Sequence, residues 1–340
     1  MINGKVNNMR KLVFSALFVA YVVVFSACSG TGSQGNGLMS SSGRAGEVLV
    51  VCGDKLWKGT LGDSLYSILM QGVWGLPQEE PMFTLSHISE EYLREAYKKQ
   101  RNIVYFTIDP SIENGKVIVN HNTWAQPQIV VRVNAKDEQQ AIETLSKYKK
   151  AIVNCLLSSE FKRFQRAQKS RQNFHLSSEV ERLFNISIVL PEGFIFALKK
   201  NNFVWLRKDT EKWTQNIMIY TEDYTNVNQF KNEYIVRFRD EQTKNYVFGT
   251  VDSSYVVVEQ KYIPTFSEQV EFENEYAIRT AGLWKMHKDF MGGPFVNMTV
   301  LDAKNNRIIT IDGFLYAPSD NKRDLLRQLE AILLSVKIIQ

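Results

Sequence analysis

The sequence predicts an α+β fold in which two domains of largely antiparallel sheet pack against helices. Two observations support this class. Short runs of alternating apolar and polar residues are separated by turn residues such as Asn114-Gly115 and Asn305-Asn306. Between these runs lie stretches with apolar residues at three- and four-residue steps, which indicate helices. One such stretch ends each half of the chain. Hairpin-linked strands with helices at intervals are typical of α+β layers.

The first domain is expected to span residues 47–178. Glu47–Cys52 indicates a buried strand, because an unbroken apolar run follows the glutamate. Asn114-Gly115 predicts a hairpin between the strands on either side of it, and the apolar stripe that begins at Leu145 predicts one long helix. In order, we expect strands over 47–52, 82–88, 102–108, 116–120 and 127–134, and helices over 62–71, 89–99 and 135–173.

The second domain, residues 179–340, is expected to be richer in strands. Ser319-Asp320 is expected to cap a final helix. Glu271, Glu273 and Glu275 are expected on one face of a strand, where they form either a solvated surface or a cation site. In order, we expect strands over 184–190, 194–198, 203–207, 216–220, 255–262, 269–279, 295–301 and 307–316, and helices over 227–241 and from 319 onward.

Residues 1–27 have the layout of a bacterial lipoprotein signal peptide. Arg10 and Lys11 precede an apolar run from Leu12 to Phe25, and small residues then lead to Cys28. The run has about 14 residues, whereas a helix needs roughly 20 to span a bilayer. The alternatives are a short membrane anchor and an ordinary cleaved signal that meets a cysteine. We expect Cys28 to be the first mature residue and to be lipidated, which anchors the protein to the membrane.

Residues 28–46 are expected to form a flexible tether, because serine, glycine and uncharged polar residues bury too little apolar surface to become ordered. Ser29 stands where an aspartate favours retention in the inner membrane of some bacteria, and the tether lacks an acidic cluster. By resemblance to other lipoproteins, we expect the protein in the cell envelope, on the periplasmic face of the outer membrane.

Charge and cysteine content narrow the function classes. Removal of residues 1–27 takes away Lys5, Arg10 and Lys11, so the formal net charge falls from +5 to +2 and a nucleic-acid partner loses its support. Cys52 and Cys155 remain. They either pair in an oxidising compartment or stay as buried free thiols, and the sequence leaves both open.

The segment from Gly282 to Phe295 is the densest unusual stretch. Gly292-Gly293-Pro294 allows positive φ angles and then fixes the backbone. One interpretation is a binding loop in which aromatic side chains gather and a histidine and an aspartate supply polar contacts. The other is a tight connection between two strands, with the aromatic residues in the core. The candidate residues of the loop are Trp284, His287, Asp289, Phe290, Gly292, Gly293 and Phe295.

His287 and Asp289 also suggest a hydrolase, since a histidine oriented by a carboxylate can activate a nucleophile. The chain has no G-x-S-x-G elbow, no S-x-x-K with its partner motifs and no H-E-x-x-H motif to accompany them. It also has no phosphate-binding glycine loop and no Cys-x-x-Cys spacing. We therefore expect no cofactor and no metal, and leave open whether the protein is an enzyme.

Five basic residues fall in the distal part of the long predicted helix: Lys162, Arg163, Arg166, Lys169 and Arg171. A tethered protein lies close to anionic headgroups, so one interpretation is contact with the membrane surface. The alternative is an ordinary solvated helix face.

Three stretches resemble one family of bacterial lipoproteins, whose domain of unknown function is numbered 4837. They are Gly282-Leu283-Trp284, the run Asp289–Phe295 and the segment Arg323–Leu333. The resemblance implies localisation and architecture but transfers no activity. Leu190–Phe194, Trp205 and the closing helix also resemble, more loosely, the Mog1/PsbP-like sandwich of a sheet with helices.

The sequence thus favours a lipid-anchored envelope protein that acts as a binding or interaction module. A partner protein in the envelope is possible on this interpretation, and the ligand is unknown. The rival hypothesis is a periplasmic hydrolase that uses His287 and Asp289 beside Gly292-Gly293.

Overall fold

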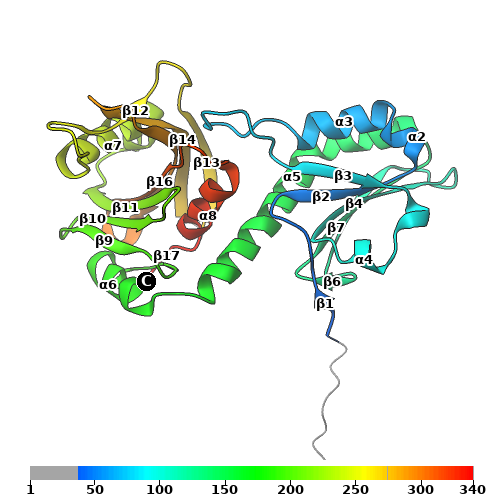
Figure 1. The fold of residues 1–340 in the computed structure, drawn as a ribbon, viewed down its shortest axis with the longest axis horizontal. Helices are drawn as coiled ribbons and strands as arrows, with labels where there is room; N and C mark the ends of the chain where they lie inside the picture. The colour runs from blue at the N-terminus through cyan, green and yellow to red at the C-terminus, as the bar shows by residue number, and fades with distance from the viewer. Residues whose placement is uncertain (1–36, 274, 340) are drawn as a thin grey trace, which may run out of the picture. The chain divides into compact units, whose positions relative to one another are not determined.

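The computed structural model describes residues 37–273 and 275–339. From Ser40 onward the chain forms one compact unit that holds two large sheets with separate cores, besides two short strand pairs (Figure 1). The predicted signal 1–27, Cys28 and the first part of the predicted tether lie outside the described residues. The described chain begins near the two-residue strand β1 (Met39–Ser40).

The first sheet has five strands in the order β3-β2-β4-β7-β5. Four of them run parallel, and β5 alone is antiparallel, paired with β7. The strands are β2 (Glu47–Val51), β3 (Thr84–Ile88), β4 (Asn102–Ile108), β5 (Lys116–His121) and β7 (Ile129–Ala135). The α+β class is confirmed for the chain as a whole, and this sheet is the exception to its largely antiparallel character.

Crossover connections explain the parallel pairing. The chain passes from β2 to β3 through helices on one face of the sheet, and from β3 to β4 through helical turns on the opposite face. Parallel neighbouring strands require such crossover connections. Asn114-Gly115 still turns the chain, but β7 lies between β4 and β5. The predicted pairing of the two strands that flank this turn is therefore wrong.

Helices cover both faces of the first sheet. One face packs its valine-rich core against α2 (Asp54–Trp57), α3 (Thr60–Leu69) and α5 (Glu138–Lys169). The other face carries a smaller apolar cluster beneath η1 (Glu90–Tyr92) and α4 (Glu95–Lys98), so the helix predicted over 89–99 is broken in two. A short strand, β6 (Ala125–Gln126), precedes β7.

A buried polar cluster fixes α5 to β4. The Glu160 carboxylate accepts hydrogen bonds from Arg163 Nη1 and from Asn102 Nδ2, both at 2.7 Å. Arg163 Nη2 also donates to the carbonyl of Arg101 at 2.7 Å. Burial lowers the pKa of Arg163 to about 10, while Glu160 raises it. Such a pair is costly to break, because each ion would be left buried without its partner.

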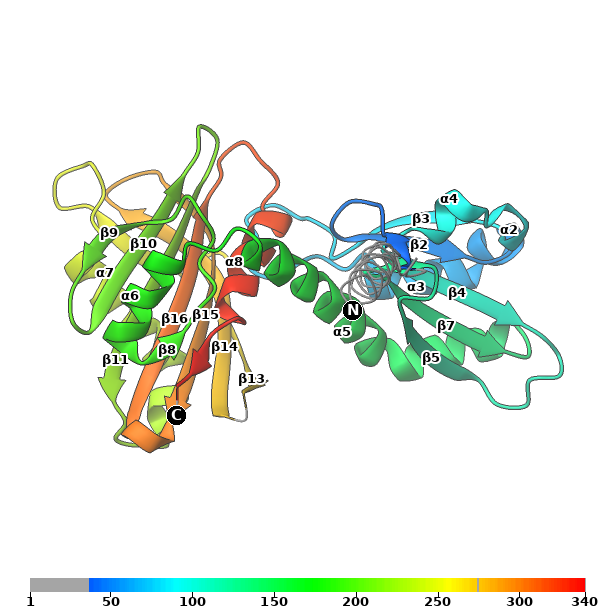
Figure 2. The ribbon, with the colours of Figure 1, turned by 90° about the horizontal axis from the view of Figure 1, so that it is seen from below.

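The second sheet has eight strands and is curled (Figures 1 and 2). The main path runs β12-β14-β15-β16-β11-β10-β9, all antiparallel, and β13 also pairs with β14. The strands are β9 (Ile195–Lys199), β10 (Phe203–Asp209), β11 (Thr214–Asp223), β12 (Tyr255–Glu259), β13 (Phe266–Phe272), β14 (Glu275–His287), β15 (Gly292–Asp302) and β16 (Arg307–Tyr316).

Each face of this sheet has its own core. One core includes residues of α6 (Phe174–Phe184) and α8 (Arg323–Leu333) and of the short pair β8 (Ile186–Ser187) and β17 (Lys337–Ile338). The other includes residues of α7 (Asn232–Tyr246), which follows η2 (Val227–Phe230). A further short helix, η3 (Ala303–Asn305), links β15 to β16. The predicted boundary at 178/179 falls within α6.

Two details correct the sequence-based prediction. The strand expected over 269–279 is a hairpin, since Glu273 has φ +50° and turns β13 into β14. The acidic residues around Glu273 therefore do not share one strand. The final helix is capped from a distance: the Glu80 carboxylate accepts from the backbone N–H groups of Lys322 and Arg323 at 2.6 and 3.0 Å.

α5 extends beyond the first sheet and contacts α8. Gln165 Nε2 donates to the carbonyl of Ala331 at 3.2 Å, and Gln168 Nε2 to that of Gln328 at 2.7 Å. These bonds tie the long helix to the second core. Across residues 37–273 and 275–339, no helix combines the length and the apolar character needed to cross a bilayer.

Candidate functional site

The predicted binding loop is the β14–β15 hairpin. Its ends are joined by a 2.8 Å bond from the N–H of Met286 to the carbonyl of Met291. Lys288 is the residue of this turn with a left-handed backbone, at φ +63°. Gly292 and Gly293 lie in β15 instead, so the positive φ angles expected of them are not needed there.

Close packing explains these glycines. A Cβ atom on Gly293 would lie 2.0 Å from the carbonyl oxygen of Leu315 on β16. A Cβ atom on Gly292 would lie 2.8 Å from the carbonyl oxygen of Trp284. Both distances are shorter than van der Waals contact, so β15 needs glycine at these two positions to approach its neighbours.

The aromatic residues of the segment point in different directions. Trp284 is 3% exposed and its Nε1 donates to the carbonyl of Leu315 at 3.0 Å. Phe295 is 1% exposed and packs beneath the guanidinium of Arg239, whose Cζ lies 4.2 Å from the ring centroid. Phe290, in contrast, is fully exposed at the tip. Of the three aromatic candidates, Trp284 and Phe295 are thus core residues, and Phe290 faces solvent.

His287 and Asp289 flank the turn without meeting. The His287 ring is exposed and lies 4.8 Å from the ring of Tyr255 on β12. The Asp289 carboxylate accepts from the N–H of Phe290 at 2.7 Å within its own turn. In the described part of the chain, no ion pair or hydrogen bond joins the two side chains. The hydrolase hypothesis therefore has a histidine and an aspartate here, but not a histidine oriented by that aspartate.

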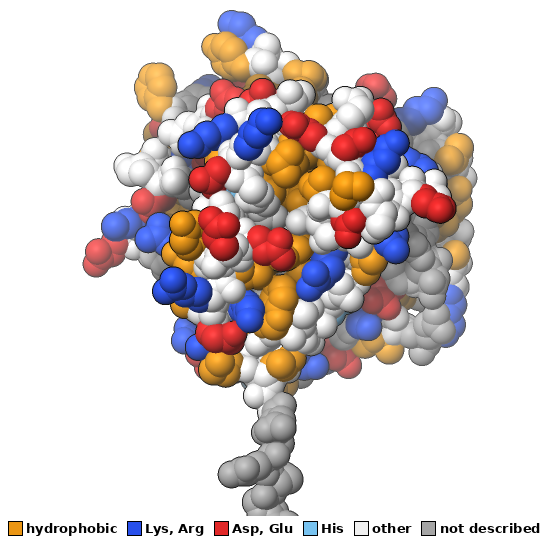
Figure 3. Space-filling view, turned by 90° about the vertical axis from the view of Figure 1, so that its right-hand side faces the viewer, with side chains coloured by type: hydrophobic (Ala, Val, Ile, Leu, Met, Phe, Trp, Pro, Cys, Tyr) orange, Lys and Arg blue, Asp and Glu red, His pale blue; other side chains and the backbone are white. Residues whose placement is uncertain are grey.

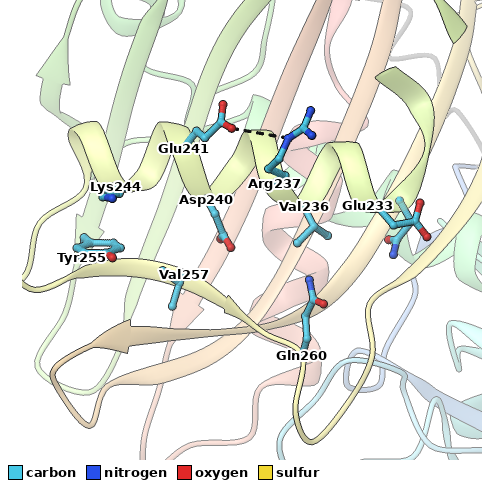
Figure 4. Close-up of a pocket in the computed structure, with 10 residues that line it drawn as sticks. Glu233, Val236, Arg237, Asp240, Glu241, Lys244, Tyr255, Val257 and Gln260 are labelled. Carbon is cyan, nitrogen blue, oxygen red and sulfur yellow. Dashed lines mark ion pairs between the residues drawn. The ribbon is translucent and has the colours of Figure 1, made fainter. Parts of the chain in front are cut away.

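Tyr255 also lines a groove between α7 and β12, of about 530 Å³ (Figure 4). Arg237 and Glu241 form an ion pair of 3.7 Å on its helical wall, and Lys244 lies 5.8 Å from the centroid of the Tyr255 ring. Charges of both signs line the groove, so it favours no ligand of a single charge.

Asp240 has a structural role in this groove. Figure 4 shows it pointing from α7 toward β12, where its Oδ1 accepts from the N–H of Val258 at 2.8 Å. One turn along, the Thr243 hydroxyl donates to the carbonyl of Val256 at 2.6 Å. These side chains satisfy backbone groups on the free edge of β12. Burial raises the pKa of Asp240, although the Val258 bond and Arg239 oppose the shift.

A larger cleft, of about 680 Å³, lies between α5, α8 and β13, and we call it the α5–α8 cleft. Apolar residues make up half of its lining and most of its accessible surface. The apolar residues are Val73, Trp74, Met82, Leu157, Phe161, Phe266, Val270, Leu326 and Leu334. Trp74 and Phe266 are each about half exposed and meet edge to face, with 6.4 Å between ring centroids. Large apolar clefts with a few polar groups are the usual places where small ligands bind.

Several basic side chains line the α5–α8 cleft, and they differ in their partners. Arg279 pairs with Glu330 at 2.5 Å and with Glu268 at 3.5 Å. Arg327 is 5% exposed, and its Nη2 donates to the carbonyl of Met82 at 2.7 Å. No carboxylate lies within 4.0 Å of Arg327 in the described part of the chain, and its Nη1 has no hydrogen-bond partner there.

Arg327 is therefore a buried cation with an incomplete set of partners. Burial and then nearby Arg323 lower its pKa to about 10, although the more distant carboxylates of Asp324, Glu160 and Glu330 oppose the shift. A pattern in the sequence could have indicated this site. Arg323, Arg327 and Glu330 recur at three- and four-residue steps beside the apolar stripe of α8, and their polar row borders the cleft.

The other sequence-based candidates can also be located. Cys28 lies outside the described residues. Cys52 is buried and Cys155 partly buried, and both are free thiols. Burial raises the pKa of each. In the described chain, no three His, Cys, Asp or Glu side chains converge to form a metal site.

Comparison with known proteins gives two family matches. Residues 173–335 match the model of a domain of unknown function, DUF4837, and residues 41–169 match that of another, DUF8532. The first match supports the resemblance seen in the hairpin and α8 motifs. The lipoprotein character stays a prediction. No curated protein matches the sequence significantly.

Solved structures give weak matches that cover 46% of this chain. They include a mutant of the protein Mog1, with 10% identity, 92% of that chain covered and a TM-score of 0.29. The Saccharomyces cerevisiae Ran-binding protein Mog1p has 11% identity, 91% coverage and a TM-score of 0.27. The human StarD13 lipid transfer and protein localization domain has 9% identity, 94% coverage and a TM-score of 0.21. Scores this low carry no argument about function.

Proposed function

We propose that the protein is a lipid-anchored binding module of the cell envelope, and that its α5–α8 cleft binds a ligand with an apolar body and an acidic group. The anchor is Cys28, and the expected location is the periplasmic face of the outer membrane. The signal-like sequence of residues 1–27 supports the anchor. The incompletely partnered Arg327 in an apolar cleft carries the binding part of the proposal.

The chemistry of the cleft determines the ligand class. A buried cation without a counter-ion is unfavourable, because burial removes its hydration. A carboxylate or similar anion beside Arg327 would supply charge-assisted hydrogen bonds, which are stronger than neutral ones. The apolar walls would bury the rest of the ligand, at roughly 25 cal/mol per Å² of apolar surface.

Anchoring and binding are tested separately. Intact-mass measurement of the native protein and labelling with a clickable fatty acid should show acylation that the Cys28→Ala variant lacks. An unmodified product that starts elsewhere would contradict the anchor. Protease treatment of intact cells should leave the protein uncut, because the expected location faces the periplasm.

Binding is tested by calorimetry with two matched ligands, dodecanoate and 1-dodecanol. The wild type should prefer the carboxylate by tenfold or more, and Arg327→Met should remove this preference while it keeps an apolar side chain of similar length. Asn154 is exposed and lines the cleft, so Asn154→Trp should fill part of the cleft and weaken the binding of both ligands without touching Arg327. Arg237→Met, at an exposed position on α7 outside the cleft, is the control. Equal binding of the two ligands to wild type would contradict the proposal.

A further inference from the structure

A second, smaller groove has a strongly basic lining. It lies between α5 and the loop around β6, measures about 420 Å³, and we call it the basic groove. Lys162, Arg163 and Arg166 line it from α5, and His121 lines it from the end of β5. Among the described residues, no acidic side chain lines it, and Ser158 and Ser159 add hydroxyl groups.

The charges of this region are not balanced. The buried carboxylate of Glu160 pairs with Arg163 at 2.7 Å and lies 3.5 Å from Arg101 Nε. Lys162 and Arg166 are exposed, and neither forms an ion pair in the described part of the chain. Four cations thus face one carboxylate, an excess of three positive charges. Lys162 and Arg166 are also one turn apart, where like charges repel.

The segment around Ser41, which leads from the predicted tether into the compact unit, lies beside this groove. Ser41 donates from its N–H to the carbonyl of Gln126 at 3.0 Å and from its hydroxyl to that of Pro127 at 2.8 Å. Pro127 lines the basic groove. From Cys28 to Ser40 the chain has 12 steps, a reach of at most about 40 Å. An acylated Cys28 would therefore keep this side of the unit near the bilayer.

We propose that the basic groove is a membrane-docking surface that binds the phosphate groups of anionic lipid headgroups. The inference rests on the proposed anchor only for the orientation, because the binding can be measured without acyl chains. Charge complementarity selects the partner: each Lys or Arg near an anionic bilayer strengthens binding about fivefold. Reversal of both Lys162 and Arg166 should therefore weaken it by more than about 25-fold.

The face seen in Figure 3 offers a contrast. It is the right-hand side of Figure 1, where the first sheet and α2 end, and there basic and acidic side chains alternate around apolar ones. Interspersed charges of this kind give no net attraction to an anionic surface. The basic groove thus differs from this face in its net charge.

The test is co-sedimentation with vesicles, using the chain from residue 28 with Cys28→Ser, which keeps the whole compact unit and cannot be acylated. Vesicles of equal parts phosphatidylglycerol and phosphatidylethanolamine are compared with pure phosphatidylcholine. The Lys162→Glu/Arg166→Glu variant should bind the anionic vesicles more weakly by more than about 25-fold. Lys147→Glu/Lys150→Glu, exposed on the same helix outside the groove, should lose less than fivefold.

Three results would overturn the proposal. Equal loss in the two double variants would indicate a general charge effect. Equal binding to the two vesicle types would exclude headgroup charge as the determinant. Complete displacement from vesicles by millimolar inorganic phosphate, at constant ionic strength, would indicate a site for free phosphate. Because the Cys28 mass measurement is independent, failure of the anchor and failure of the groove are distinguishable.

Discussion

The buried ion pair between Arg239 on α7 and Asp312 on β16 gives the sharpest stability prediction. Both side chains are completely buried, and the pair is bidentate, with Nε–Oδ2 at 2.8 Å and Nη2–Oδ1 at 3.1 Å. Asn297 adds a third bond to the carboxylate at 3.0 Å. Asp312→Asn keeps the shape of the side chain but leaves the guanidinium without its counter-ion.

We expect Asp312→Asn to lower the free energy of unfolding by about 3–5 kcal/mol, the usual cost of removing one partner of a buried pair. This is a large share of a total stability of about 5–15 kcal/mol. The exposed pair Arg207–Asp209 has the same 2.8 Å distance and provides the control. Asp209→Asn should cost at most about 1 kcal/mol, because solvent screens the charges.

Urea unfolding, followed by tryptophan fluorescence and circular dichroism, measures these differences. A double-mutant cycle of Arg239→Met, Asp312→Leu and their combination completes the test, since the double variant removes both charges and should be less destabilised than either of these single variants. A cost below about 1 kcal/mol for Asp312→Asn would refute the reasoning. So would a double variant whose loss equals the sum of the two single losses.

Three further predictions concern packing and ionisation. Gly293→Ala should lower the free energy of unfolding, measured in urea, by about 1–3 kcal/mol, because its Cβ would clash with the Leu315 carbonyl. Gly53→Ala is the control and should be nearly neutral, because no atom lies within 4 Å of the added Cβ. Burial, followed by nearby negative charge, raises the pKa of Cys52 to about 12, so a disulfide reagent at pH 8 should leave this thiol unmodified until the protein unfolds. Burial alone would raise the pKa of Asp302, but hydrogen bonds from its neighbours lower it overall. Its stabilising effect should therefore be full above about pH 4 and disappear as the pH falls through the folded pKa, and Asp302→Asn should flatten this acid limb of the unfolding free energy.

Local signals predicted most of the elements. The apolar patterns correctly indicated the strands over 102–108, 203–207 and 307–316 and the long helix after 135, because a period of two or of three to four residues reflects one buried face. The pairing of strands was less accessible. Asn114-Gly115 predicts a turn correctly, but which strand then lies beside β5 depends on crossover connections that a local pattern does not contain.

Sites were harder to predict than elements, because a site depends on contacts between distant segments. The aromatic and glycine residues of 282–295 stand out in the sequence, yet Trp284 and Phe295 are core residues, and Gly293 is required by a carbonyl on another strand. The α5–α8 cleft combines residues around 74, 161, 266 and 327. In the sequence, only the row of charged residues on the last helix indicates this cleft. Glu80, which caps that helix, is more than 240 positions away.

The completeness of the ion pairs separates the structural arginines from the candidate functional one. Arg239 and Arg163 are buried with a carboxylate in direct contact, so their charges are balanced when no ligand is bound. Arg327 is buried to a similar degree, but its direct contacts in the described part of the chain are the carbonyl of Met82 and the ring of Phe83, 5.4 Å away. Asp324, Glu160 and Glu330 act on Arg327 only from a distance, so this guanidinium, unlike the other two, has no carboxylate in direct contact. The imbalance is understandable if the missing negative charge arrives with a ligand, and it is this expectation that the carboxylate and alcohol pair tests.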